Sequence, residues 1–224
     1  MSVLRTLSVL CLIAVELQHR IWQLSLSGRL HFAPLQPAPT QALDIGCGTG
    51  AWVIEFADQY PDCQITGIDL SAIQPTSHPP NVDFRISDLT ADWSYPHKFD
   101  YIHSRAITAG VRDWTKLVDD VWDNLEPGGW VEFQEYHLPF LCDDGTIEDG
   151  PPTFKRWNET FPVAAAKAGL KLDAIFEVPP LLEKQSFVSP GHAAMKWPLG
   201  SWAKGEREKQ IGEMLAEVCV CLQR

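Results

Sequence analysis

The chain has 224 residues, of which 45% are hydrophobic and 21% charged, and its formal net charge is −11. The composition is that of an ordinary globular protein, and the length suits one domain with a substantial core better than two. An acidic surface of this size repels phosphate backbones, so we expect no nucleic-acid partner.

The first element is expected at an apolar run, Leu7 to Val15, which follows Arg5. Such a run resembles the core of a signal peptide, but Glu16 follows it directly and no small-residue cleavage site is present. The run is also too short to cross a bilayer. We therefore predict a helix over 7–30 that packs on the domain, and no membrane association.

From Ala42 the pattern alternates between strand and helix, which is typical of a parallel α/β sheet. Strands are predicted at 42–45, 64–70, 82–87, 99–104 and 130–136, and helices at 51–60 and 114–125. The second helix has the clearest apolar face, made by Trp114, Leu117, Val118, Val121, Trp122 and Leu125. Asp113 is placed to cap it, and Pro127-Gly128-Gly129 predicts a tight turn after it.

After Phe140 the alternation stops. Residues 142–152 are acidic and are predicted to form a loop, 153–169 a helix that Pro162 interrupts, and 206–222 a final amphipathic helix. The chain thus divides into a helical segment and linker at 1–39, a Rossmann-like core at 40–140, and a helical insert with an incomplete C-terminal part at 141–224.

The six cysteines form no CxxC pair and no cluster with histidine: they are Cys11, Cys47, Cys63, Cys142, Cys219 and Cys221. This spacing favours reduced thiols over disulfides, and so predicts a cytoplasmic or nuclear protein. The pair Asp143-Asp144 reads as part of an acidic solvated loop, and we predict no metal site.

The central motif runs from Leu43 to Gly50, where a strand leads into a glycine loop and then a helix. Gly46, Gly48 and Gly50 allow the backbone to approach a ligand closely, and Cys47 lies inside the same loop. The motif also fits a dinucleotide fingerprint, read as Gly46, Gly48 and Ala51, so a nicotinamide cofactor is a competing interpretation.

Asp44 distinguishes between a dinucleotide and the other candidate cofactor, S-adenosylmethionine. A dinucleotide needs its pyrophosphate held at the helix N-terminus, and a carboxylate just before the loop does not favour that anion. S-adenosylmethionine (SAM) instead carries a sulfonium and an ammonium group, which a carboxylate favours.

Two further acids follow the next strands. Asp69, with Leu70 beside it, ends the second strand, where a carboxylate can accept both hydroxyls of a ribose. Asp88 follows the third strand, where it can accept from an adenine amino group while Leu89 packs on the ring. The alternative for either acid is that it serves only as a cap.

His103 and Arg105 end the fourth strand. Ligands of open parallel sheets bind outside the carboxyl ends of the strands, so both side chains are expected to face the methionine end of SAM or the methyl acceptor. A structural role is the alternative for each.

Taken together, the segments ALDIGCGTG, GIDLS, ISDLTADW, FDYIHSR, RDW and LEPGGWVEFQEY occur in the order and spacing of one family. From Gly28 to Trp202 the chain resembles fungal class I methyltransferases of the LaeA-like kind. The resemblance implies a seven-stranded SAM-dependent fold, with Asp44 and the three glycines on SAM, Asp69 on the ribose, and Asp88 with Leu89 on the adenine. It also implies a place in fungal secondary metabolism, as a tailoring enzyme or as a regulator.

The chain departs from the family pattern at both ends. Members carry a longer N-terminal region with a tyrosine-containing segment that helps to close the SAM pocket, and they end with another strand. We therefore expect a mostly parallel sheet, flanked by helices, that lacks its last strand and exposes an edge.

Methyl transfer needs the acceptor held in line with the departing sulfur, and a general base only if the acceptor must lose a proton. Candidates for that base are His103, Glu135 and His137, whereas Glu132, Glu135 and Tyr136 can also be structural. We predict a small-molecule methyltransferase; the alternative is a regulator that acts through protein partners. An NAD-dependent oxidoreductase is the third and least favoured hypothesis.

Overall fold

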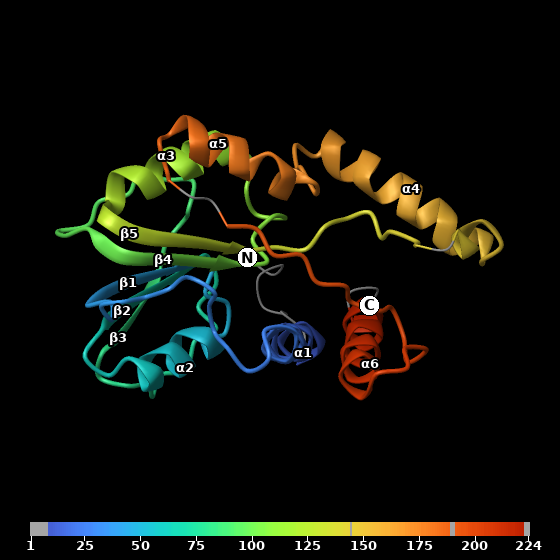
Figure 1. Cartoon of the computed structure of the whole chain (residues 1–224), viewed down its shortest axis with the longest axis horizontal. Coiled ribbons are helices and arrows are strands. Elements are labelled where there is room, and N and C mark those ends of the chain that lie inside the picture. Colours follow the sequence, from blue (N-terminus) through green and yellow to red (C-terminus); the bar gives the residue numbers. More distant parts are fainter. Residues whose placement is uncertain (1–8, 144, 189–190, 222–224) are drawn as a thin grey trace, which may run out of the picture.

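Five parallel strands form one sheet at the centre of the computed structural model, which describes residues 9–143, 145–188 and 191–221 (Figure 1). They are β1 (Gln41–Ile45), β2 (Gln64–Asp69), β3 (Val82–Ile86), β4 (Phe99–Arg105) and β5 (Leu125–Gln134). Their order is β3-β2-β1-β4-β5, and every pairing is parallel. The order reverses between β1 and β4, which is where sheets of this kind bind ligands. The predicted parallel α/β sheet is confirmed.

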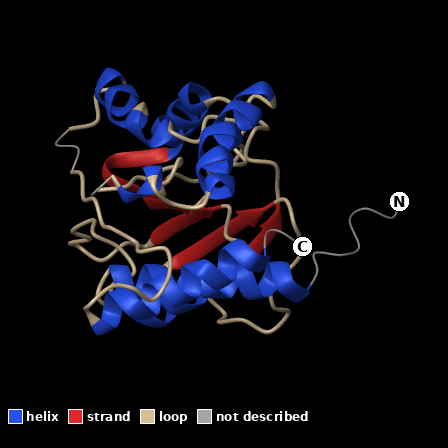
Figure 2. Ribbon diagram, turned by 90° about the vertical axis from the view of Figure 1, so that its right-hand side faces the viewer, coloured by secondary structure: helices blue, strands red, loops and turns tan. Residues whose placement is uncertain are grey.

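Helices cover both faces of the sheet (Figures 1 and 2). α2 (Ala51–Gln59) packs on one face, and α3 (Trp114–Asn124) with α5 (Val178–Lys184) on the other. Since strand side chains alternate, Ala42 of β1 joins the core on the α2 side and Leu43 the core on the α3 side.

α3 begins as predicted, because Asp113 Oδ1 accepts a hydrogen bond from the Lys116 backbone N at 3.0 Å. Most of its apolar face is buried, but Trp122 is an exception that remains 40% exposed. Its ring meets Phe187 edge-on, with 5.0 Å between ring centroids, so Trp122 lies at the margin of the core.

α1 (Val9–Ser25) and α6 (Glu206–Cys221) lie side by side and share a small core of their own. Leu7 and Ser8 of the predicted helix, and Leu222 of the last one, lie outside the described residues. The predicted extension of α1 to residue 30 is wrong. Ser27 and Gly28 have φ angles of +55° and +79°, which no helix continues through. The described part of the chain contains no helix long and apolar enough to cross a membrane.

Pro127-Gly128-Gly129, which the sequence predicts as a turn before the strand, falls within the bounds of β5. Leu125 pairs with Phe99, and the next pair is Tyr101 with Trp130. Residues 126–129 of β5 therefore lie opposite one residue of β4 and form an irregularity in the ladder. Gly128 supplies the required backbone angle, with φ at +85°. The strand also ends at Gln134, before the predicted Tyr136.

The C-terminal third differs from the prediction in three places. α4 (Pro152–Lys167) runs unbroken through Pro162, and the predicted loop contains a short 3₁₀ helix, η1 (Thr146–Glu148). A second one, η2 (Ala174–Phe176), leads into α5, which the sequence pattern did not reveal. Its prolines occupy the first turn, where a missing N–H costs no helical hydrogen bond.

Candidate cofactor site

The glycine loop between β1 and α2 is built from left-handed backbone. Gly46, Gly48 and Gly50 have φ angles of +72°, +55° and +80°. A Cβ on Gly46 would lie 2.5 Å from Ile107 Cγ2, and one on Gly50 would lie 2.5 Å from Phe84 Cζ. Glycine is therefore required here by the backbone and by packing within the protein, besides the predicted approach of a ligand.

Asp69 ties this loop to the end of β2. Its Oδ2 accepts a hydrogen bond from Gly48 N at 2.9 Å, and its Oδ1 accepts one from Ser71 N at 2.8 Å. Each carboxylate oxygen can accept a further hydrogen bond. The two bonds therefore fix the side chain and still leave acceptor sites for a ligand. The structure thus brings Asp69 to the glycine loop, with Leu70 exposed beside it.

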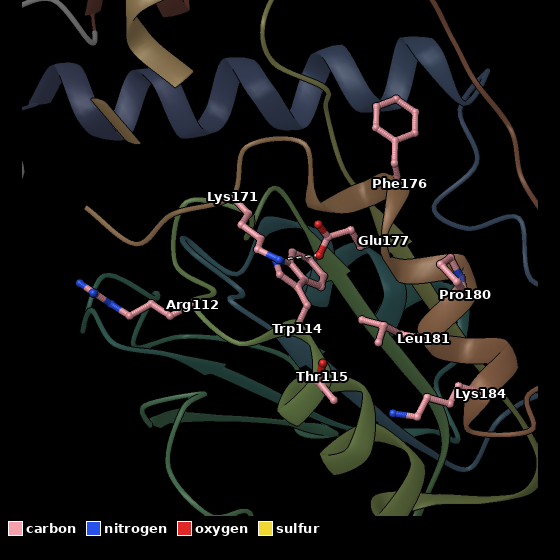
Figure 3. Close-up of a pocket in the computed structure, with 9 residues that line it drawn as sticks. All are labelled: Arg112, Trp114, Thr115, Lys171, Phe176, Glu177, Pro180, Leu181 and Lys184. Carbon is pink, nitrogen blue, oxygen red and sulfur yellow. Dashed lines mark hydrogen bonds and ion pairs between the residues drawn. The ribbon is translucent and has the colours of Figure 1, made fainter. Parts of the chain in front are cut away.

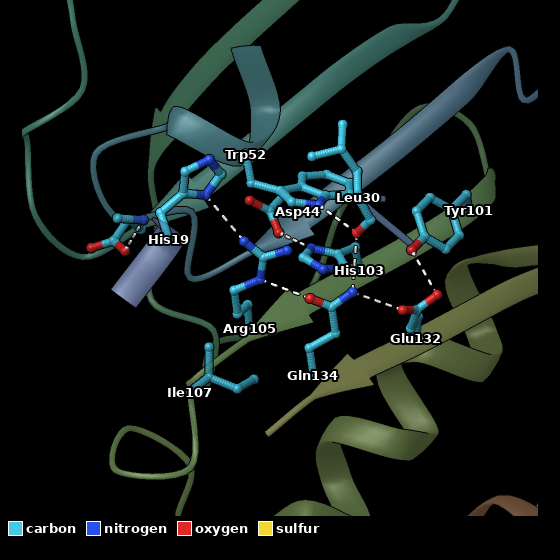
Figure 4. A network of polar contacts seen from close by, with 12 residues as sticks. His19, Leu30, Asp44, Trp52, Tyr101, His103, Arg105, Ile107, Glu132 and Gln134 are labelled. Carbon is cyan, nitrogen blue, oxygen red and sulfur yellow. Dashed lines mark hydrogen bonds and ion pairs between the residues drawn. The ribbon is translucent and has the colours of Figure 1, made fainter. Parts of the chain in front are cut away.

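Asp44 and His103 form a buried pair beneath the loop (Figure 4). His103 Nδ1 donates to Asp44 Oδ1 at 2.7 Å, and the imidazole stacks on the indole of Trp52 with 3.7 Å between centroids. His103 is fully buried, and its Nε2 has no hydrogen-bond partner among the described residues. The expectation that His103 faces a ligand does not fit this geometry, because Trp52 and Asp44 enclose the ring; it supports Asp44 instead.

Arg105 lies next to this pair and points into the same region (Figure 4). Its Nε donates to Gln134 Oε1 at 2.7 Å and its Nη1 to His19 Nδ1 at 3.1 Å, while Trp22 lies against the guanidinium. Burial lowers the pKa of Arg105 to about 10, and the nearby Asp44 carboxylate opposes that shift. The group is therefore charged at neutral pH, yet its buried Nη2 lacks a partner among the described residues.

Glu132 is structural, which is one of the two roles that the sequence left open. It accepts hydrogen bonds from the backbone N atoms of Phe32 and Ala33, and from the Gln134 side chain. It thereby fastens the segment before β1 to β5.

The N-terminal helix α1 lies against the glycine loop, which the sequence analysis did not predict. Thr49 Oγ1 donates to Glu16 Oε1 at 2.8 Å, and His19 Nε2 lies 3.2 Å from Glu55 Oε2. Gln23 also donates to Glu55, at 2.7 Å. The spacing of Glu16, His19 and Gln23 as one polar stripe on an apolar helix is the signal that could have indicated these contacts.

Asp88 caps its own turn. Its Oδ1 accepts from Thr90 N at 2.8 Å and from Thr90 Oγ1 at 2.7 Å, and these bonds lower the pKa of the exposed carboxyl. Leu89 packs on the core between the sheet and α3. Their predicted adenine contact stays a prediction.

The other two candidates for a general base lie just past the end of β5. Glu135 accepts from Ile107 N at 2.8 Å and from Thr108 Oγ1 at 2.7 Å, while burial raises its pKa to about 7. The ring of His137 meets Phe176, with 5.0 Å between centroids. Glu135 and His137 therefore both lie at the carboxyl edge of the sheet, whereas the His103 ring is enclosed by Trp52 and Asp44.

Comparison with known proteins agrees with this geometry. A family model described as a methyltransferase domain matches residues 17–174. Methyltransferase pytC of Aspergillus terreus is 34% identical over 203 residues, which are 90% of this chain and 62% of that protein. Secondary metabolism regulator LAE1 of Cochliobolus heterostrophus is 31% identical, over 88% of this chain and 66% of its own length. The chain thus spans about two thirds of these relatives.

A solved structure shows the same fold. Phosphoethanolamine N-methyltransferase 2 of Haemonchus contortus, in complex with phosphomonomethylethanolamine and S-adenosylhomocysteine, superposes with a TM-score of 0.57. It is 21% identical, and the match covers 82% of this chain and 43% of that one. The chain belongs to the methyltransferase domain family, and the fungal proteins that it resembles include methyltransferases and regulators of secondary metabolism.

Proposed function

We propose that the chain is a SAM-dependent methyltransferase that acts on a small molecule of fungal secondary metabolism. One observation carries the choice of cofactor: a carboxylate and an unsatisfied guanidinium flank the same glycine loop. Asp44 is buried and Arg105 is half-buried, the two interact electrostatically, and the buried Nη2 of Arg105 lacks a partner among the described residues. This pair suits a ligand that carries an ammonium and a carboxylate on one carbon, as the methionine end of SAM does.

The other predicted site residues would each contact a different part of the cofactor. Asp69 would accept the ribose hydroxyls at the end of β2, and Asp88 with Leu89 would hold the adenine at the end of β3. Cys47, Leu70 and the three glycines would provide the surface along which the ligand lies. When bound, SAM supplies an activated methyl group, and the protein's part is to hold the acceptor in line with it.

Glu135 is the strongest of the three candidates for a general base. A base is most effective when its pKa lies near the working pH, and the pKa of Glu135 is raised to about 7. His137 is the second candidate, whereas the enclosed ring of His103 serves Asp44.

The test compares Arg105→Met in two titrations, with SAM and with 5′-methylthioadenosine, which keeps the adenosine and sulfur but lacks the amino-acid end. We expect SAM to bind at least ~10-fold more weakly, because a charged hydrogen bond is worth about 1.5–3 kcal/mol, and methylthioadenosine to bind as before. Arg85→Met, which removes an exposed arginine on β3, is the matched control. Equal weakening of both ligands would contradict the assignment.

The alternative function, a regulator that works through protein partners, is suggested by the name of the relative LAE1. Transfer of radiolabelled methyl from SAM to a small-molecule extract would favour the enzyme. SAM binding without any transfer to small molecules would favour the regulator. A cytoplasmic or nuclear location, and the absence of a nucleic-acid partner, stay predictions.

A further inference from the structure

One turn of α1, which carries Val15, Glu16 and His19, lies against the glycine loop. Glu16 Oε1 accepts a hydrogen bond from Thr49 Oγ1 at 2.8 Å. A Cβ built on Gly48 would lie 3.5 Å from Val15 Cγ1, which is an ordinary van der Waals distance. The polar side chains of this turn therefore lie beside a ligand that the loop holds.

The same turn of α1 orients Arg105 (Figure 4). Burial and the Arg105 charge lower the pKa of His19, so its ring is neutral at neutral pH. Its Nδ1 can then accept the hydrogen bond from Arg105 Nη1, at 3.1 Å. Trp22, one turn further along α1, lies against the guanidinium, with 5.5 Å between Cζ and the ring centroid. α1 thus holds the guanidinium whose buried Nη2 has no partner among the described residues.

A negative charge stands close to that guanidinium. Glu16 and His19 are three residues apart on a helix, and side chains with this spacing are neighbours on one face. The Glu16 carboxylate therefore lies on the same side of α1 as the guanidinium that His19 contacts. In the described part of the chain Glu16 forms no ion pair and no second hydrogen bond, so its Oε2 is available to a ligand.

Two other acids near this end of the loop are already engaged. Asp44 is 3% exposed, lies beneath the loop and is bonded to His103. Glu55 accepts hydrogen bonds from Gln23 through both of its carboxylate oxygens. Glu16 is exposed and uses one oxygen only, so it is the acid best able to accept hydrogen bonds from a cation that lies on the loop.

We propose that Glu16 binds the α-ammonium group of the cofactor while Arg105 binds its α-carboxylate. This assignment rests on the proposed function, because it concerns the same ligand. An ammonium and a carboxylate on one carbon need an acceptor and a donor close together, and α1 brings both to one side of the loop. Asp44 favours the same positive charge from beneath. Because Glu16 is exposed, its effect on affinity should shrink as ionic strength rises.

The test is Glu16→Gln, which removes the charge but keeps an oxygen that can accept from Thr49. Four probes are titrated by calorimetry into the full chain. SAM and decarboxylated SAM both carry the ammonium group. The 2-oxo analogue of SAM has a carbonyl in place of the amine, and 5′-methylthioadenosine lacks the whole amino-acid end. We expect the variant to bind the first two about 5-fold more weakly and the other two unchanged.

Glu213→Gln is the matched control, because it removes an exposed carboxylate from α6, the helix that packs beside α1. It should leave all four affinities unchanged, and thermal unfolding of both variants checks that the fold is retained. Equal weakening of all four probes by Glu16→Gln would mean that Glu16 only holds the loop through Thr49. That result, or unchanged SAM binding, would overturn the assignment and leave the cofactor proposal standing.

The unmodified chain reports on the proposed function separately. If it binds neither SAM nor methylthioadenosine, the proposed function fails, and the assignment of Glu16 fails with it.

Discussion

At the scale of single residues, the Asp44–His103 pair explains how an acid can sit beneath the loop. A carboxylate without a partner is costly to bury, and the imidazole offers it a hydrogen bond of 2.7 Å. Trp52 stacks on the ring and fixes its orientation. The pair therefore presents Asp44 to the loop in one defined position.

Removing the imidazole should leave this carboxylate buried and alone. We expect His103→Leu to lower the free energy of unfolding by about 3 kcal/mol, measured by urea denaturation. His192→Leu, at an exposed histidine, should change it by less than ~0.5 kcal/mol. A similarly small change for His103→Leu would show that Asp44 does not depend on the pair.

Glu135 makes stability depend on pH. Its folded pKa of about 7 lies above the ordinary value of 4.5, so the folded state holds the proton more tightly than the unfolded state. Its contribution is therefore fully present below about pH 4.5 and is lost as the pH rises through 7.

Glu135→Gln should remove this dependence. Between pH 5 and pH 8 the variant should gain up to about 3 kcal/mol relative to the unmodified chain, as measured by urea denaturation across that range. Two curves that stay parallel over the whole range would contradict the raised pKa.

The motif spacing predicted which residues meet at the carboxyl edge of the sheet. It did not predict which contacts each side chain makes there. Asp44, Asp69 and Arg105 lie at or next to the last residue of a strand, and parallel topology brings these strand ends together. The enclosure of His103 depends on Trp52 from a different element, and the contacts of Glu16 and His19 depend on where α1 packs. Such long-range packing leaves little trace in local periodicity.

At the scale of elements, the N-terminus of α3 is held by a side chain. Asp113→Ala removes the bond to Lys116 N and should lower the free energy of unfolding by about 1 kcal/mol. Asp123→Ala, an exposed change near the other end of the same helix, should not destabilise the protein. Equal losses in chemical denaturation would mean that the cap contributes nothing specific.

The docking of α6 depends on Gly212. A Cβ there would lie 2.0 Å from the Gly200 carbonyl oxygen, so a backbone segment would have to move. Alanine favours helix by up to about 1 kcal/mol, but we expect the clash to prevail and Gly212→Ala to destabilise by about 1–3 kcal/mol.

The exposed change Gln210→Ala on the same helix is the control for that variant, and thermal unfolding is the measurement. A more stable Gly212→Ala protein would show that propensity outweighs the contact with Gly200.

Elements with a strong period were predictable and irregular ones were not. α3 shows a clear apolar face, whereas β5 contains a Pro-Gly-Gly segment that reads as a turn and lies unpaired between Leu125 and Trp130, which both pair with β4. α5 begins with two prolines, which locally resemble a break. Both segments read locally as breaks, yet each falls within a regular element.

At the scale of the whole molecule, chain segments distant in sequence meet beside the glycine loop, which is the proposed cofactor site. α1 from the N-terminal part packs on α6 from the C-terminal part, and α1 also contacts the glycine loop. The three parts predicted from the sequence therefore meet in space, around the point where the strand order reverses. A surface pocket lies on the face of the sheet that α3 and α5 cover (Figures 1 and 3).

The most direct test of the central claim is calorimetric titration of the purified chain with SAM and with NAD⁺, beside Asp69→Ala and the exposed control Asp83→Ala. We predict saturable SAM binding, no NAD⁺ binding, a loss of ~10-fold or more in SAM affinity for Asp69→Ala, and no loss for Asp83→Ala. NAD⁺ binding in place of SAM, or SAM binding that Asp69→Ala leaves intact, would contradict the account.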